Sequence, residues 1–557
     1  MALWKQLIPV LLSVIFATSN VLAHESHAAA QSTSTEANVA VPLYDDLGDL
    51  TYPITTSSPL AQRYFDQGLR LTYAFNHAEA QRAFREAQRQ DPHCALCYWG
   101  EAFGLGPNIN APMDEAAGNP AIAALTKAKA LAPHASDREQ ALISALAKRY
   151  TDDLKVDRKA LDQAYADAMA EAARRFPDDP EIAVLYVDAL MNLSPWDYWE
   201  ADGKTPKGKI GVAIQTAEKV LEHNPNHPGA IHLYIHLTEA STTPERAEPY
   251  ANRLAALMPG AGHIVHMGSH TFFRIGRYQD SATTNKAAVK ADEAYLARVK
   301  AEGIYPYGYY PHNIHFVLAS AQMAGDGPTA LEYAQRLEGK IPDAMAQQVG
   351  WIQAIKIAPY FAHAQFSAPE TILALPDPGG TFPLVQAMWH YARGVALAAK
   401  GDLDAARSEA ARIAALNQKT DFSDLLAWAV PAPDILRLAQ HVVEGRIAQA
   451  QGDFARAIKE FQIAVSIQDA FAYMEPPYWY YPVRQSLGAT LLAAGKPAEA
   501  EQAFTHSLEQ FPNSGWALYG LMKAQQAQGN EAAAKVTEQR FKQAWAGDAN
   551  TLDPRRL

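Results

Sequence analysis

The chain has 557 residues, of which 48% are hydrophobic and 19% are charged, so it can bury a large core and is long enough for several domains. Its formal net charge of −12, without any block of Lys or Arg, argues against a nucleic-acid-binding surface. Only two cysteines occur, and both lie in one CxxC motif, which excludes a fold held together by several disulfides.

The first 23 residues have the features of a secretory signal peptide. Lys5 lies near the start, an apolar run covers residues 7–17, and a small-residue exit ends at Ala23. This run is shorter than the roughly 18 apolar residues that a transmembrane helix needs, and no later stretch reaches that length. We therefore expect an exported protein, periplasmic or secreted, with no membrane span, whose residues 24–56 form a flexible N-terminal segment.

The CxxC motif, Cys94 and Cys97, follows at the predicted start of a helix. Tyr98 comes after it in place of the histidine of a c-type haem attachment site, which excludes that function. The pair can form a short disulfide, act as a redox dithiol, or bind a metal together with His93. A locally paired, structural role is the interpretation we favour.

Small and aromatic residues recur along the chain at the spacing of the tetratricopeptide repeat (TPR), about 34 residues. The clearest units carry Tyr64, Gly68, Ala80, Phe84 and Pro92 near the start, Gly445, Ala457 and Phe461 further on, and Gly488, Ala500, Phe504 and Pro512 near the end. Strand patterns of period two are nearly absent. The sequence therefore predicts an all-α, tetratricopeptide-type helical-repeat solenoid, in which antiparallel helix pairs form a right-handed superhelix.

Irregular stretches rich in Gly and Pro interrupt this array. Two of them, residues 104–120 and 194–209, are long loops of the kind that usually lie over the binding face of a solenoid. We expect an N-terminal solenoid over 57–365, an irregular connector over 366–384, C-terminal TPR repeats over 385–547 and a tail over 548–557.

Histidines recur at helical spacing in three successive units between residues 227 and 315. At about 100° per residue, each set lies on one helix face, beside the apolar stripe that packs the repeats together. The sets are His232 and His236 with Glu239, then His263, His266 and His270, then His312 and His315. In the repeat register these positions line the concave surface, so the sequence predicts one histidine-lined groove.

Imidazole is a common ligand of zinc, copper and iron, and histidine pairs three or four residues apart on adjoining helices can reach one ion. The groove is therefore a candidate site for one or two transition metal ions, held for storage, for delivery or for chemistry on a small molecule. In a catalytic version, Glu239 is the nearest candidate base. The sequence leaves open whether the protein is an enzyme. The competing interpretation is that these histidines are hydrogen-bonding residues of a groove that binds a peptide or a small acid.

Other residues are weaker candidates for the groove. Trp196, Asp197 and Tyr198 can form a lid over it or a loop pinned to the core by its aromatic rings. Two aromatic-Pro helix entries add candidates: Tyr310 opens the helix of His312, and Arg484 follows the run at 478–482 and can hold an anion or form an ion pair. By contrast, His390 and His441 occupy packing positions, and we interpret them as structural.

Several longer segments carry a family resemblance. They are DPHCALCYWGEAFGLGPNINAPM, SPWDYW, HPGAIHLYIHLTEAS, GHIVHMGSH, YYPHNIHF and PPYWYYPVRQSLGATLLAAG. These segments resemble those of a group of bacterial exported TPR proteins, over almost the whole predicted mature chain. Where relatives commonly read HMPSH, this chain has HMGSH, which keeps both histidines, His266 and His270. The resemblance implies the helical-repeat fold and export, and implies no particular activity.

Two functions of different class follow from these patterns. In the first, the groove binds a transition metal ion, and the histidine rings must then converge to within a few Å. In the second, the solenoid is a scaffold that binds a protein or peptide partner, and the rings are then spread along the wall. The geometry of the rings separates the two.

Overall fold

The computed structural model describes residues 41–153, 156–301 and 303–552, and the predicted signal peptide, residues 1–23, lies outside this part of the chain. From Leu43 onward the described residues form one compact unit. Its regular elements are helices, with two isolated β-bridges and no strand in the described residues. The predicted all-α helical-repeat fold is therefore confirmed. None of the described helices combines the length and apolar character that a membrane crossing requires.

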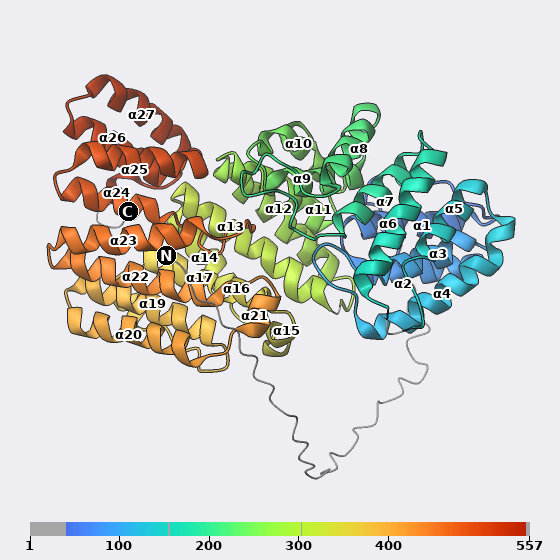
Figure 1. Ribbon diagram of the computed structural model, residues 1–557, viewed down its shortest axis with the longest axis horizontal. Coiled ribbons are helices and arrows are strands. Elements are labelled where there is room, and N and C mark those ends of the chain that lie inside the picture. The colour runs from blue at the N-terminus through green and yellow to red at the C-terminus, as the bar shows by residue number, and fades with distance from the viewer. Residues whose placement is uncertain (1–40, 154–155, 302, 553–557) are drawn as a thin grey trace, which may run out of the picture. The chain divides into compact units, whose positions relative to one another are not determined.

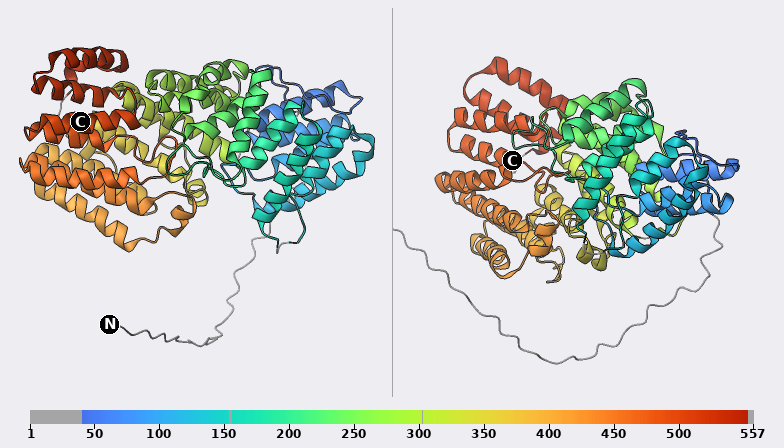
Figure 2. Two further views of the ribbon diagram at one scale, coloured as in Figure 1. Left: turned by 45° about the horizontal axis from the view of Figure 1, so that its top comes forward. Right: turned by 45° about the vertical axis from the view of Figure 1, so that its right-hand side comes forward.

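The helices pack as consecutive neighbours along the chain, as Figures 1 and 2 show. The first group consists of α1 (Pro59–Tyr73), α2 (His77–Gln90), α3 (Ala95–Gly104), η2 (Glu115–Ala117), α4 (Gly118–Leu131), η3 (Ala132–His134), α5 (Asp137–Leu146), α6 (Arg158–Arg175), α7 (Pro180–Met191) and α8 (Ile210–His223). The middle group consists of α9 (Pro228–Glu239), η4 (Pro244–Ala247), α10 (Glu248–Leu257), α11 (Gly262–Arg274), α12 (Tyr278–Leu296), η5 (Tyr305–Tyr309), α13 (Tyr310–Ala324) and α14 (Gly327–Leu337).

The third group consists of α15 (Asp343–Gln348), α16 (Ile352–Lys356), α17 (Ala358–Phe366), α18 (Pro369–Leu373), α19 (Pro383–Lys400), α20 (Leu403–Lys419), α21 (Ser423–Ala427), α22 (Ala432–Ala450), α23 (Phe454–Asp469), α24 (Val483–Ala493), α25 (Pro497–Gln510), α26 (Gly515–Ala527), α27 (Glu531–Ala544) and η6 (Ala549–Thr551). The stretch at 366–384, which we expected to be irregular, carries the short helix α18 between α17 and α19. Residues 43–56, the last part of the segment expected to be flexible, are instead tied to the helices. Tyr52, for example, bonds to Asp66 and Asp179.

A glycine and a capping residue form the turn inside many helix pairs. Gly325, Gly401, Gly452 and Gly529 adopt φ angles of 80°, 81°, 73° and 74°, a left-handed conformation that glycine adopts without steric cost. Each is followed by an Asp or Asn whose side chain accepts one free N–H group in the first turn of the next helix. The same two-residue pattern in the sequence therefore forms the same turn in each of these helix pairs.

A second repeated device explains the glycines inside the helices. Phe84, Phe461 and Phe504 each follow a helical glycine by 16 residues, and each phenyl ring packs against that glycine. A Cβ added at Gly488 would lie 2.7 Å from the Phe504 ring, closer than a real Cβ contact allows. The glycine thus lets the two helices of the pair approach each other.

Replacing Gly488 by alanine is expected to lower the free energy of unfolding by about 1–3 kcal/mol, because the new methyl group overpacks the Phe504 ring. Urea unfolding of the full chain measures this change. Gly118→Ala is the matched control, since a Cβ at Gly118 meets nothing within 4 Å. Equal stability of the two variants would show that this contact does not limit the packing of the pair.

Candidate metal centre

Three helices of the middle group bring the predicted histidines together. α9, α11 and α13 are the first helices of successive pairs, and α11 packs against both of the others (Figure 1, green helices). Apolar residues beside the histidines, such as Ile235, Val265 and Ile314, bury the seams between these helices. The histidine faces of the three helices therefore meet inside the molecule.

Four side chains form a first convergent set, which we call the four-ligand group: His266, His270, His312 and Glu475. The Nε2 atom of His266 lies 2.7 Å from Nε2 of His270 and 3.2 Å from Nε2 of His312. The Glu475 Oε2 atom lies 3.2 Å from Nε2 of both His270 and His312. This oxygen is buried and accepts no hydrogen bond. Three imidazole nitrogens and a carboxylate oxygen thus surround one point.

Three further histidines form a second set, the three-histidine group: His232, His236 and His263. The Nε2 atoms of His232 and His236 are 3.1 Å apart. The His263 ring lies next to the His232 ring, with 5.0 Å between centroids, and its two nitrogens are buried without a hydrogen-bond partner.

Oxygen acceptors fix the tautomers of these rings. The Nδ1 atom of His232 lies 2.6 Å from the Tyr73 carbonyl oxygen, which can only accept, so this nitrogen carries the proton. The Nδ1 atom of His266 lies 2.6 Å from Oδ1 of Asn285, whose amide group donates to the Ser281 carbonyl and is thereby oriented. In neutral rings of this kind the lone pair is on Nε2, so the lone pairs face one another.

The contact between His266 and Asn285 belongs to a repeated pattern. His390 bonds to Glu409 and His441 to Glu460 over the same separation of 19 residues, each from the first helix of a pair to the second. These two carboxylate-paired histidines have the packing role that the sequence predicts for them. At His266 the partner is a neutral amide, so the Nδ1 side of this ring contacts no carboxylate.

Glu239 connects the two groups from outside them. Its two carboxylate oxygens each lie 2.7 Å from an Nδ1 atom, Oε1 from His236 and Oε2 from His270. The Tyr473 hydroxyl donates to Oε2 over 2.8 Å. This carboxylate orients one ring of each group, an arrangement typical of metal-bound histidines. Both oxygens of Glu239, the candidate base of the sequence analysis, thus accept hydrogen bonds.

Burial sets the protonation of the cluster. Desolvation lowers the pKa of His232, His263 and His266 well below the usual range, and the neighbouring histidines add to the effect. Burial acts in the same direction on His270, but the Glu475 and Glu239 carboxylates outweigh it and raise the pKa of that ring. Neutral rings with an available lone pair, next to carboxylates, are the state that binds a metal cation.

Carboxylate and aromatic side chains close the cluster, so it is not the open groove that we expected. Among the histidines, His232 and His266 have no exposed surface. Glu475 and Tyr473 come from the loop between α23 and α24, more than 160 residues beyond His312 in sequence. Trp196 lies edge-on to the His236 ring, with 5.1 Å between centroids.

The two long loops predicted to cover the binding face meet beside the cluster. The Trp196 indole N–H donates to the Asn110 side chain, whose amide donates in turn to the Tyr309 hydroxyl. The Tyr309 ring packs against His263 at 4.8 Å between centroids. Asn110 and Trp196 belong to the loops at 104–120 and 194–209, so both loops reach residues beside the cluster.

Several predicted site residues lie elsewhere. His315 shares α13 with His312 but packs against Tyr480, and its nitrogens contribute to neither group. Tyr310 donates to Glu293, and Arg484 forms an ion pair with Asp469. In the Trp196 loop, the exposed Asp197 pairs with Lys207, and Tyr198 is buried in the core.

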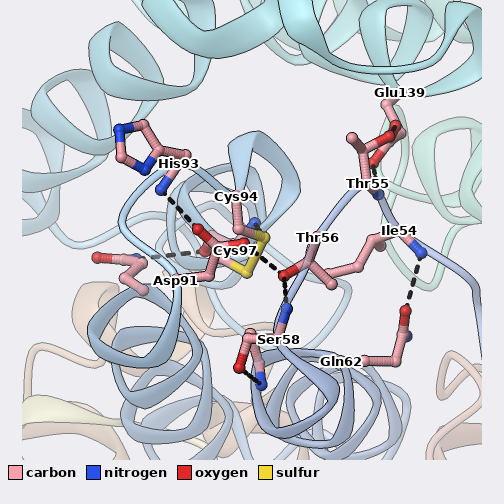
Figure 3. Close-up of a disulfide and its surroundings, with 12 residues drawn as sticks. Ile54, Thr55, Thr56, Ser58, Gln62, Asp91, His93, Cys94, Cys97 and Glu139 are labelled. Carbon is pink, nitrogen blue, oxygen red and sulfur yellow. Dashed lines mark hydrogen bonds between the residues drawn. A yellow bond between two sulfur atoms is a disulfide. The ribbon is translucent and has the colours of Figure 1, made fainter.

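The CxxC pair forms a disulfide, Cys94 to Cys97, at the start of α3 (Figure 3). Both cysteines are fully buried, and Sγ of Cys94 accepts the N–H of Cys97. His93 is exposed, and its ring points away from the sulfur atoms in Figure 3. Of the three alternatives left open by the sequence, the structure contains the short disulfide, and a shared metal site with His93 does not form.

Fold and repeat pattern define a helical-repeat protein of the tetratricopeptide type. Residues 491–550 match the family model described as tetratricopeptide repeat, which covers α25, α26 and α27. No curated protein matches the sequence.

Solved structures similar to this chain share 12–13% sequence identity with it. The human IFIT1 dimer with m7Gppp-AAAA is 12% identical over 88% of this chain and 91% of that chain, with a TM-score of 0.31. Yeast Tom70 is 13% identical over 86% and 89%, with a TM-score of 0.29. Naa15/Naa10 bound to HypK-THB is 13% identical over 87% and 70%, with a TM-score of 0.22.

Proposed function

We propose that this protein is an exported metalloprotein that holds a transition metal ion, zinc, copper or iron, in the four-ligand group at the centre of its helical-repeat fold. The observation that carries the proposal is the convergence of three Nε2 atoms and the Glu475 oxygen, which all lie within 4.8 Å of one another and form four pairs at 2.7–3.2 Å. In a tetrahedral site with metal–nitrogen bonds of about 2.0–2.1 Å, neighbouring ligand atoms are about 3.3 Å apart. The four close pairs are therefore already near the separation that such a site requires.

Electrostatics favour an ion over the metal-free arrangement. Lone pairs of neutral imidazoles repel each other at these distances, and the buried Glu475 oxygen lacks any donor. A proton on His270 satisfies one nitrogen pair and leaves the others unsatisfied. A divalent cation satisfies all four atoms at once and balances the buried carboxylate.

The geometry supports the metal hypothesis over the scaffold hypothesis. A peptide-binding groove requires exposed, spread histidines, whereas these rings converge and are buried. Burial under the Tyr473–Glu475 loop favours a resident ion over cargo that is passed on. Export is part of the proposal: it rests on the predicted signal peptide, and the Cys94–Cys97 disulfide is typical of an oxidising compartment.

Elemental analysis of the exported full-length chain, purified without an affinity tag or chelator, tests the proposal. We expect at least one transition metal ion per chain, and the loss of one ion in a His312→Ala variant that keeps its helical circular dichroism. His441→Ala is the matched control, because that histidine bonds to Glu460 outside the cluster, and it should keep the full metal content. Absence of metal from the wild type, even after incubation with zinc, copper and iron salts, would refute the proposal.

A further inference from the structure

The three-histidine group has unsatisfied ligand atoms of its own. His232 and His236 direct their Nε2 atoms toward each other at 3.1 Å, and His263 offers a third nitrogen within 4.8 Å of both. His263 is only 2% exposed, yet neither of its ring nitrogens has a hydrogen-bond partner. Buried polar atoms are normally paired, so this ring indicates a ligand that the protein chain itself does not supply.

Phe75 holds this group from an unusual backbone conformation. It occupies the turn between α1 and α2, directly before the cap residue Asn76, where other pairs have a left-handed glycine. Its φ angle is 54°, and its ring stacks on the His263 ring at 5.3 Å between centroids. A phenylalanine is strained in this conformation, and such strain persists mostly at functional sites.

Trp196 is a second aromatic residue with a strained backbone, and it lies on another side of the group. Its φ angle is 66°, and its indole ring lies edge-on to His236. Two aromatic side chains with strained backbones thus enclose the same three imidazoles, together with the Tyr309 ring beside His263. The strained backbone thus holds these rings against the imidazoles, and the rings leave little space around the nitrogens.

Charge distinguishes this group from the four-ligand group. Its three ligands are neutral imidazoles, whereas the first group includes the Glu475 carboxylate. Glu239 bonds to the outer nitrogen of His236 and shares its charge with His270. A divalent ion held by three neutral ligands keeps its charge and an open coordination position, and such an ion attracts a small anion or hydroxide.

A small cavity reaches one ligand of the group, His232. A cavity of about 20 Å³ is lined by Phe75, His77, Asp188 and His232, among others. A cavity of this size admits a ligand of only a few atoms. A peptide or a sugar ring is too large for it.

We propose that His232, His236 and His263 hold a second transition metal ion with an open coordination position that binds a small anion of a few atoms. The inference rests on the proposed function, because Glu239 links both groups and the second ion lies beside the first. The protein then contains two adjacent ions of different character, one enclosed by four protein ligands and one accessible to a small ligand.

Cobalt(II) loading of the full-length chain, followed by azide titration, tests the inference. We expect two cobalt ions per chain and a change in the visible cobalt spectrum on addition of azide. His263→Phe keeps an aromatic ring against Phe75 but removes both nitrogens, so it should bind one cobalt ion and lose the response to azide. His315→Phe is the matched control, because His315 is likewise buried with two unpartnered nitrogens but lies outside both groups.

The outcomes distinguish the inference from the proposed function. One cobalt ion in the wild type, retained in a folded His263→Phe variant, overturns the second site and leaves the first intact. Two ions with no response to azide overturn the open coordination position. No bound cobalt in any form, with folding confirmed by near-ultraviolet circular dichroism, overturns both proposals together.

Discussion

Replacing Glu475 by alanine is expected to abolish most of the stabilisation that a metal ion gives to the protein. At a free metal concentration of 100 times Kd, binding stabilises the wild-type fold by about 2.7 kcal/mol. Glu475 supplies the only carboxylate of the four-ligand group, so its loss removes both a ligand and the charge that balances the ion. Urea unfolding with and without zinc measures how much the metal raises the free energy of unfolding. Each protein is compared with its own metal-free form.

Glu460→Ala serves as the control for this experiment. Glu460 also bonds to a histidine, His441, but in α23 and outside the cluster. Its replacement should leave the metal-induced gain unchanged, even if the metal-free protein is less stable. If zinc raises the free energy of unfolding of Glu475→Ala as much as that of the wild type, the carboxylate does not contact the ion.

Replacing Glu239 by glutamine is expected to weaken metal binding about 10–100-fold, although Glu239 is not itself a ligand in either group. A carboxylate accepts from the Nδ1–H groups of both His236 and His270, but an amide offers one oxygen and one donor group. One of the two rings must then move its proton to Nε2, which removes that nitrogen from its group. Competition with a chelator of known affinity measures the change.

Tyr473→Phe is the matched variant for this second prediction. It removes the hydroxyl that donates to Glu239 and leaves both histidine contacts of the carboxylate in place. Its effect on metal affinity should be clearly smaller than that of Glu239→Gln. Wild-type affinity in Glu239→Gln would contradict the bridging role of this carboxylate.

Much of the fold was predictable because it repeats. Glycine–phenylalanine pairs at a constant separation and Gly–Asp turns are local signals, and each describes one helix pair that stacks on the next. The same regularity placed the histidines on the first helices of three successive units. Six of the seven predicted histidines belong to the two groups, because helical spacing determines which side chains share a face.

His315 shows where this reasoning stops. It lies three residues after His312 on the same helix, so both satisfy the helical spacing. The loop between α23 and α24, however, places Tyr480 next to His315 and Glu475 next to His312. Which of the two belongs to the site therefore depends on a contact with a distant part of the chain, which spacing cannot reveal.

Other site residues that were not predicted also depend on contacts between distant parts of the chain. Glu475 and Tyr473 lie in an irregular loop, and only the aromatic run after them marks it. The sequence did contain a signal for Phe75. It precedes Asn76 at the position where other units have a glycine before the capping residue. The sequence also contained a signal for Asn285, which stands where two other units have a glutamate that bonds to a histidine.

Anomalous diffraction at the absorption edge of the bound metal, from crystals of the exported full-length protein, tests the central claim most directly. We expect an anomalous peak about 2.0–2.1 Å from the Nε2 atoms of His266, His270 and His312, with Glu475 as the fourth ligand. A map without a peak in this position, from protein incubated with zinc, copper or iron, would contradict the account. So would a metal bound only at surface residues.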